Sequence, residues 1–206
     1  MKLPPLPLQP YISELTEPPA RRGPKPKIPT ERWFLTALEQ LATGGIDSVR
    51  VELVAGQLGV TKGMFYARFP SRDAFLEAMI DYWRLRTTTG LVTELGALDA
   101  APEDRLVRLF SIPDMDRAKT GAYIEMAMRT WALTDERPAK AMAEIDRHRL
   151  AYFEAVIAAN GIPAEQVQAR AFLIYSYVIT DTLLPGNRAA LRELCRSFLS
   201  DRRTDG

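Results

Sequence analysis

The sequence has few residues of the kinds that carry chemistry: one cysteine, Cys195, and one histidine, His148, among 206 residues. A single thiol cannot form an intramolecular disulfide, so we expect a protein of a reducing compartment, the cytoplasm. No group of residues has metal-ligand spacing, no nucleophile is paired with a base, and no glycine-rich phosphate loop is present. We therefore expect no catalytic residues, no bound metal and no cofactor.

The chain also lacks a long apolar segment and a large net charge. Its most apolar stretch, 171–180, is followed by Asp181 and is far shorter than the roughly 20 residues of a membrane span, so we expect no membrane association. The formal net charge is only +1, but its distribution is uneven. Residues 21–73 hold nine Lys and Arg against five Asp and Glu, whereas residues 74–206 hold seventeen against nineteen. The positive charge therefore gathers near the N-terminus.

From residue 30 onward the apolar residues have helical spacing and no segment alternates like a strand, which predicts an all-α fold. Thr30 is expected to cap a first helix that ends at Gly44, and Ser71 a long helix that ends near residue 89. Proline and glycine separate further helices, expected at 102–110, 119–134, 137–159, 164–184 and 188–200. We divide the chain into an arm (1–27), a small three-helix unit (28–72) and a larger helical domain (73–206).

Residues 51–69, VELVAGQLGVTKGMFYARF, fit two short helices joined by a tight turn. Gly59 lies where the first helix must stop, and the Thr61 hydroxyl can cap the second. Phe65 and Phe69, four residues apart, fit core positions beneath the second helix. The outward positions carry polar and basic residues, as in a helix that enters the DNA major groove. The alternative is a pair of ordinary core helices joined by a glycine turn.

The arm before this unit is rich in proline, without hydrophobic periodicity, which predicts disorder. It ends in RRGPKPK at 21–27, where four cations alternate with proline and glycine. Such a strip cannot form a helix, but it can follow a phosphate backbone or lie in a narrow minor groove. The alternative is a solvated tail.

The chain resembles the tetracycline-repressor (TetR) family of bacterial transcriptional regulators. The resemblance covers about residues 28–80 and is carried by Gly44-Gly45-Ile46, Val51, Ala55, the run Leu58-Gly59-Val60-Thr61-Lys62-Gly63, Phe65-Tyr66, Phe69 and Arg72-Asp73. It implies an N-terminal helix-turn-helix DNA-binding domain, followed by a helical domain for effector binding and dimerisation. It also implies a ligand-responsive repressor that binds a palindromic operator as a homodimer. The alternatives are an activator without a small-molecule effector and a helical interaction module.

Double-stranded DNA is the expected partner of the short second helix. Lys62 is expected to bind phosphate, Gly63 to allow a close approach, and Tyr66 to reach a phosphate or a base edge. Met64 and Arg68 depart from the residues common in the family, so the operator sequence stays open. Arg50 and Arg72 flank this helix, and the alternative for both is a solvated helix end. The full set of expected DNA contacts is Arg21, Arg22, Lys25, Lys27, Arg50, Thr61, Lys62, Gly63, Met64, Tyr66, Arg68 and Arg72.

The resemblance implies that helices 137–159 and 164–184 pair with their symmetry mates in a four-helix bundle. It also implies an effector pocket between the long helix and the dimer helices. Aromatic and methionine side chains with one or two charges suit a mostly apolar ligand that carries a polar or anionic group. We expect the pocket to be lined by Trp83, Arg86, Tyr123, Met126, Arg129, Thr130, Trp131 and Tyr175, with Met115 and Phe172 nearby. The alternative is that these residues belong to an ordinary core.

Overall fold

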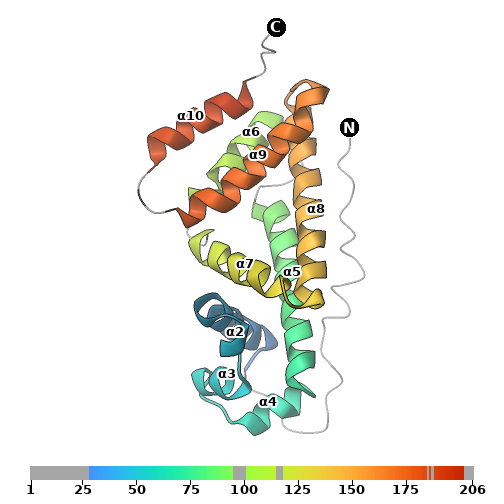
Figure 1. Cartoon of the computed structure of the whole chain (residues 1–206), viewed down its shortest axis with the longest axis vertical. Helices are drawn as coiled ribbons and strands as arrows, with labels where there is room; N and C mark the ends of the chain where they lie inside the picture. The colour runs from blue at the N-terminus through green and yellow to red at the C-terminus, as the bar shows by residue number, and fades with distance from the viewer. Residues whose placement is uncertain (1–27, 95–100, 115–117, 185, 187, 202–206) are drawn as a thin grey trace.

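The computed structural model describes residues 28–94, 101–114, 118–184, 186 and 188–201. These residues form nine α-helices, two short 3-10 helices and no strand, which confirms the expected all-α fold (Figure 1). The helices are α2 (Thr30–Gly44), η1 (Ile46–Ser48), α3 (Val51–Gln57), α4 (Lys62–Arg68), α5 (Arg72–Glu94), α6 (Pro102–Ser111), η2 (Ile112–Asp114), α7 (Ala118–Ala132), α8 (Glu136–Ala159), α9 (Ala164–Leu183) and α10 (Ala189–Ser200). Within these ranges no helix is long and apolar enough to span a membrane.

Two of the three expected N-caps are present. The Thr61 hydroxyl accepts a hydrogen bond from the Met64 backbone N–H at 3.4 Å, and the Ser71 hydroxyl accepts one from Ala74 at 3.0 Å. The prediction for Thr30 was wrong: Thr30 is the first residue of α2, and Pro29 occupies the cap position without a side-chain acceptor. The long helix also continues past its expected end, because one glycine inside a helix costs only about 1 kcal/mol.

An aromatic cluster holds α4 against its neighbours. Phe65 and Phe69 are buried, and both pack on Phe75 of α5, with ring centroids 5.1 and 4.8 Å apart. Trp33 of α2 meets Phe65 edge-on at 5.8 Å. Aromatic pairs of this kind stabilise by about 0.5–1.5 kcal/mol beyond the area they bury. The inner face of α4 is therefore fixed, and its other face is free to meet a partner.

The core of this N-terminal unit continues into the body of the molecule. Met128 and Trp131 of α7, and Met142 and Ile145 of α8, belong to the same buried cluster as Trp33. Helix α7 crosses between the unit of α2, α3 and α4 and the helices above it (Figure 1). A second buried cluster joins α6, α8, α9 and the end of α10. The boundary expected at residues 72 and 73 stays a prediction; the structure shows α5 running through it.

Candidate nucleic-acid interface and ligand cavity

The turn between α3 and α4 is set by Gly59. Its φ is +69°, in the left-handed region that favours glycine. The Gly59 N–H donates to the Gly56 carbonyl at 3.0 Å, and the Val60 N–H donates to the Ala55 carbonyl at 2.9 Å. This pair of bonds is the Schellman ending of a helix, and it fixes the direction in which the chain enters α4.

Helix α4 presents its early turns to solvent. Lys62, Gly63 and Tyr66 are exposed, Tyr66 by 51%. Met64 and Arg68 are half-buried. A Cβ placed on Gly63 would meet only the Thr61 hydroxyl, at 3.6 Å, which is an ordinary contact. The fold itself therefore leaves room for a side chain at position 63.

Lys62 has an acidic partner. Its ammonium group forms an ion pair with the Glu52 carboxylate of α3, and both side chains are more than half exposed. The hydrogen bond from Lys62 lowers the pKa of Glu52, and the same bond raises the pKa of Lys62. The cation expected to bind phosphate is thus neutralised in the isolated chain.

The two flanking arginines differ. Arg50 is exposed at the cap position of α3. The Arg72 guanidinium turns inward, where Nε donates to the Val49 carbonyl at 3.0 Å and Nη2 to the Ile46 carbonyl at 3.3 Å. Arg72 therefore ties the start of α5 to the segment before α3, and a role in DNA contact stays a prediction. Arg21, Arg22, Lys25 and Lys27 lie outside the described residues.

A cavity of about 180 Å³ lies between α5, α7, α8 and α9. Four of the residues expected in an effector pocket line it: Trp83, Met126, Arg129 and Tyr175. The remaining lining residues are Thr87, Ile112, Gly121, Ala122, Glu125, Arg149, Phe153, Val178, Ile179, Thr182 and Leu183.

Four expected pocket residues lie elsewhere. Arg86 points to α2, where it donates to Glu31 at 2.6 Å. Trp131 is buried in the core shared with α2. Tyr123 and Thr130 are exposed and do not line the cavity. Helical periodicity places residues on a face, but it does not show which face of α7 meets which neighbour. Of the two nearby residues, Phe172 is exposed on α9 and Met115 lies outside the described residues.

A network of charged side chains closes one side of the cavity. Arg129 of α7 bonds to Glu125 at 2.8 Å and to Asp146 of α8 at 2.6 Å. Arg149 donates to the other Glu125 oxygen at 2.8 Å. The Tyr175 hydroxyl donates to Asp146 at 2.5 Å, and burial, which is the main cause, raises the pKa of Tyr175 to about 12. The network joins α7, α8 and α9 by charge-assisted bonds.

Arg149 and Glu125 are the cavity residues that sequence reasoning missed. Arg149 lies four residues after Ile145 and four before Phe153, both of which are fully buried. An arginine in the apolar row of an amphipathic helix indicates a buried charge that needs a partner, so the sequence pattern could have identified Arg149. Its partner Glu125 lies 24 residues away on another helix, which no local pattern indicates.

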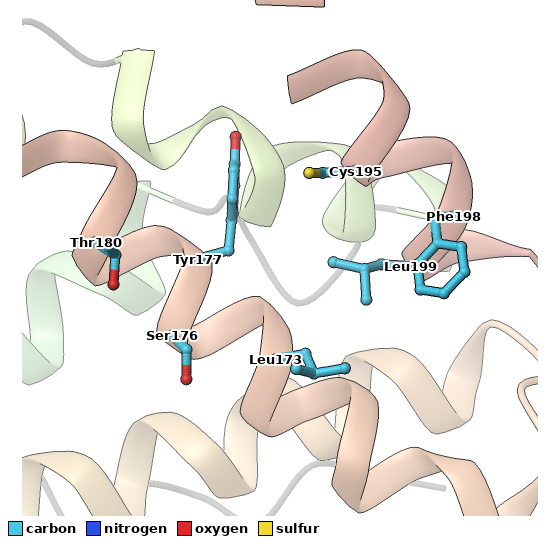
Figure 2. A pocket seen from close by; sticks show the side chains of 7 residues that line it. All are labelled: Leu173, Ser176, Tyr177, Thr180, Cys195, Phe198 and Leu199. Atoms are coloured by element: carbon cyan, nitrogen blue, oxygen red, sulfur yellow. The ribbon is translucent and has the colours of Figure 1, made fainter. Parts of the chain in front are cut away.

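An apolar groove runs between α9 and α10 at the far end of the molecule. The groove is lined by Leu173, Ser176, Tyr177 and Thr180 of α9 and by Cys195, Phe198 and Leu199 of α10 (Figure 2). Large apolar side chains are exposed around it: Phe172, Leu173, Leu191, Leu194 and Phe198.

Helix α8, expected to form half of a dimer bundle, has no large exposed apolar side chain. Its apolar face is covered by α5, α6, α7 and α9 of the same chain. Of the two helices expected in the bundle, α9 therefore carries exposed large apolar side chains and α8 does not, while α10 carries further ones; the four-helix bundle stays a prediction.

Comparison with known proteins assigns the N-terminal unit. Residues 35–79 match the model of the bacterial regulatory proteins of the tetR family. Over 57 residues the chain is 37% identical to YuxN, an uncharacterised HTH-type transcriptional regulator of Bacillus subtilis (strain 168). That match takes in 28% of this chain and 20% of the length of YuxN.

Solved structures extend the likeness to the remaining helices. A transcriptional regulator from Rhodococcus sp. Rha1 has a TM-score of 0.64 at 18% identity, over 84% of this chain and 92% of that one. A TetR transcription regulator from Haloarcula marismortui ATCC 43049 has a TM-score of 0.62 at 17% identity, over 83% and 94%. Identities this low show a shared fold alone. The helix-turn-helix unit of this chain therefore matches that of the tetR family of bacterial regulatory proteins, and the helices that follow share the fold of solved transcriptional regulators.

Proposed function

We propose that this chain is a cytoplasmic transcriptional repressor that binds a palindromic DNA operator as a homodimer and is released by a small ligand. The observation that carries the proposal is the exposed face of α4, where Lys62, Gly63 and Tyr66 stand on a helix fixed from behind by aromatic packing. A short helix held in this way can enter the major groove as a rigid body. Lys62 then binds phosphate, and Tyr66 reaches a phosphate or a base edge.

The glycine in α4 supports a close approach to DNA. Glycine at a helical position usually destabilises by about 0.5–1 kcal/mol relative to alanine. No steric crowding inside the protein compensates for this cost, since a Cβ at Gly63 would make only an ordinary contact. We infer that the space is needed outside the chain, where the sugar-phosphate backbone lies in the complex.

The homodimer is supported by the apolar surface of α9 and α10. Leu191, Leu194 and Phe198 are spaced i, i+3 and i+7, so they form one stripe on α10. An exposed stripe of this kind beside an apolar groove fits a second copy of the same surface across a two-fold axis. The dimer would then place two α4 helices in successive major grooves, roughly 34–36 Å apart.

Ligand response is supported by the position of α7. One part of this helix lines the cavity through Glu125, Met126 and Arg129, while Met128 and Trp131 pack in the core of the N-terminal unit. A ligand that favours another position of α7 would shift the population toward a dimer whose α4 helices no longer match the groove spacing.

A mobility-shift titration of the full chain on DNA from upstream of its own gene tests the proposal. The expected result is a discrete complex whose affinity falls linearly on a log-log plot against salt. Lys62→Ala should reduce that slope by about one unit, because one phosphate contact is lost. Lys140→Ala is the matched control, since Lys140 also forms an exposed ion pair, with Glu136 at 2.9 Å on α8. An unchanged slope for Lys62→Ala, or no complex at all, would contradict the proposal.

A further inference from the structure

We propose that the cavity between α5, α7, α8 and α9 binds a small monocarboxylate of about the size of benzoate, with its carboxylate held by Arg149. The inference rests on the proposed ligand response and gives the ligand a chemical class. Two observations support it: the hydrogen bonds among the residues that line the cavity, and the N–H donors of Arg149 that have no acceptor among them.

The acceptors at the cavity wall are already engaged. Glu125 accepts from Arg129 through Oε1, at 2.8 and 3.2 Å, and from Arg149 through Oε2 at 2.8 Å. Asp146, behind Arg129, accepts from Arg129 through both of its oxygens and from the Tyr175 hydroxyl. Each carboxylate oxygen of the network thus has a donor. Each of the two carboxylates accepts three bonds out of about four that it can accept, so the network offers little acceptor capacity to a ligand such as an amine.

Arg149 keeps an unused edge of donors. Its Nη1 donates to Glu125 and, at 3.3 Å, to the Tyr175 hydroxyl. Its Nε is buried and meets no acceptor among the residues that the structure describes, and no bond from Nη2 to any of them is formed. The N–H groups of Nε and Nη2 point the same way, and their spacing matches the two oxygens of a carboxylate. A buried donor without an acceptor is destabilising, so a ligand oxygen that reaches Nε once the Arg149 side chain shifts toward the cavity gains more than one at the surface.

Charge favours an anion over a neutral acceptor. Two guanidinium groups, Arg129 and Arg149, and one carboxylate, Glu125, line the cavity, while the second carboxylate of the network, Asp146, is held behind Arg129 and away from the lining. Burial would lower the pKa of Arg149, but the Glu125 charge and the hydrogen bonds of Tyr175 and Glu125 outweigh it, and the pKa is raised. The guanidinium stays protonated at neutral pH, and its charge at the cavity wall is shared with Glu125 through their ion pair.

The cavity sets the size of the rest of the ligand. Its 180 Å³ corresponds to roughly six liquid-water volumes, less than the 300–1,000 Å³ typical of sites for drug-sized molecules. Most of the wall is apolar and is formed by Trp83, Ile112, Phe153, Val178, Ile179 and Leu183. One aromatic ring or a short alkyl chain fills such a space, and a long acyl chain does not. Entry is open on α7, where Met126 is 43% exposed.

Carboxylate binding would also act on α7. Arg149 of α8 is bonded to Glu125 of α7 through Nη1, so a ligand carboxylate on the Nε and Nη2 edge shares the guanidinium charge with Glu125 and weakens their ion pair. Weakening that ion pair changes how α7 is held, and α7 packs on the N-terminal unit through Met128 and Trp131.

Calorimetric titration of the full chain with benzoate, hexanoate and benzamide tests the inference. Benzamide has the shape of benzoate without the charge, so we expect benzoate to bind at least about tenfold more tightly. Arg149→Gln should weaken benzoate by about tenfold or more and leave benzamide unchanged. Arg147→Gln, an exposed arginine two residues away on α8, is the matched control and should bind benzoate normally.

Three results would overturn the inference: equal binding of benzoate and benzamide, full benzoate affinity in Arg149→Gln, or no binding of either carboxylate. Thermal unfolding shows whether Arg149→Gln is folded. If it is not, Arg149→Lys keeps the charge without the planar fork, and it should still lose several-fold in benzoate affinity. A mobility-shift titration with DNA and no added carboxylate distinguishes a failure of the carboxylate site from a failure of the proposed DNA-binding function. DNA binding without carboxylate binding contradicts this inference alone, and carboxylate binding without DNA binding contradicts the proposed function.

Discussion

The Lys62 ammonium and the Glu52 carboxylate form an ion pair across the turn that joins α3 to α4. The pair lies on the surface that is proposed to meet DNA. While the Lys62 ammonium is paired with Glu52, its interaction with a DNA phosphate is weaker. Glu52 therefore competes with DNA for the cation that is nearest to the start of α4.

Replacing Glu52 by glutamine should strengthen DNA binding. Glu52→Gln frees Lys62 and removes a negative charge that faces the phosphates, so we expect the affinity at about 0.1 M salt to rise by about two- to fivefold. The gain should shrink as salt screens both charges. Mobility shifts at several salt concentrations measure it, with Glu165→Gln on α9 as a control of equal charge change. A loss of affinity in Glu52→Gln would mean that the carboxylate orients Lys62 for DNA and does not compete with it.

The left-handed turn predicts opposite effects of alanine at two neighbouring glycines. Gly59→Ala should lower the free energy of unfolding by about 1–2 kcal/mol, because a Cβ is strained at φ +69°. Gly56→Ala, inside α3 with nothing near its added Cβ, should be neutral or stabilise by up to about 1 kcal/mol. Urea denaturation of both variants gives the comparison. Equal stability of the two would show that the turn relaxes without cost.

Gly63→Ala should separate stability from DNA binding. The protein has room for the added methyl group, so the free energy of unfolding should stay unchanged or rise slightly. DNA affinity should fall by about tenfold or more if the backbone of α4 lies against the phosphates. Gly56→Ala again serves as the control, this time for DNA binding. Normal affinity in Gly63→Ala would place that backbone farther from the DNA than we propose.

Charge on the α10 stripe should break the dimer. Leu194→Glu introduces a carboxylate into the apolar surface of α9 and α10, where pairing with a second copy would bury it. Sedimentation or light scattering at micromolar concentration should then report one chain instead of two. Leu133→Glu, at an even more exposed leucine outside this surface, is the matched control and should stay dimeric. A wild-type monomer would exclude the dimer directly.

The cap of α8 predicts an acid-dependent loss of stability. Hydrogen bonds from Arg137 lower the pKa of Asp135 from 3.8 to about 2. The carboxylate therefore contributes fully above about pH 4, and its contribution is lost as the pH falls toward 2. Asp135→Asn keeps an oxygen for the cap and loses the charge, so its free energy of unfolding should depend less on pH over that interval. Asp104→Asn, an exposed acid in the first turn of α6, is the control.

The elements that the sequence predicted well depend on neighbours in the chain. Gly59 and Thr61 end one helix and begin the next through bonds that reach no more than five residues, so their pattern is readable locally. The burial of Phe65 and Phe69 follows from their spacing on a single helix turn.

What sequence reasoning missed depends on contacts between distant segments. Arg86 looked like a pocket residue, but Glu31, 55 positions earlier, binds it on α2. Helix α8 is covered by four helices of its own chain, whereas α10 leaves Leu191, Leu194 and Phe198 exposed. Such partners are set by the packing of whole helices, and apolar periodicity is the same whether a face meets its own chain or a second one.

The continuous core has a practical consequence for protein engineering. Because Trp33 of α2 shares its buried surroundings with Met128 and Trp131 of α7, a fragment cut after α5 would leave an apolar face in water. Fusing the N-terminal unit to another ligand-binding domain would therefore require α7 to be included in the fusion. Otherwise the apolar face that α7 covers would have to be redesigned.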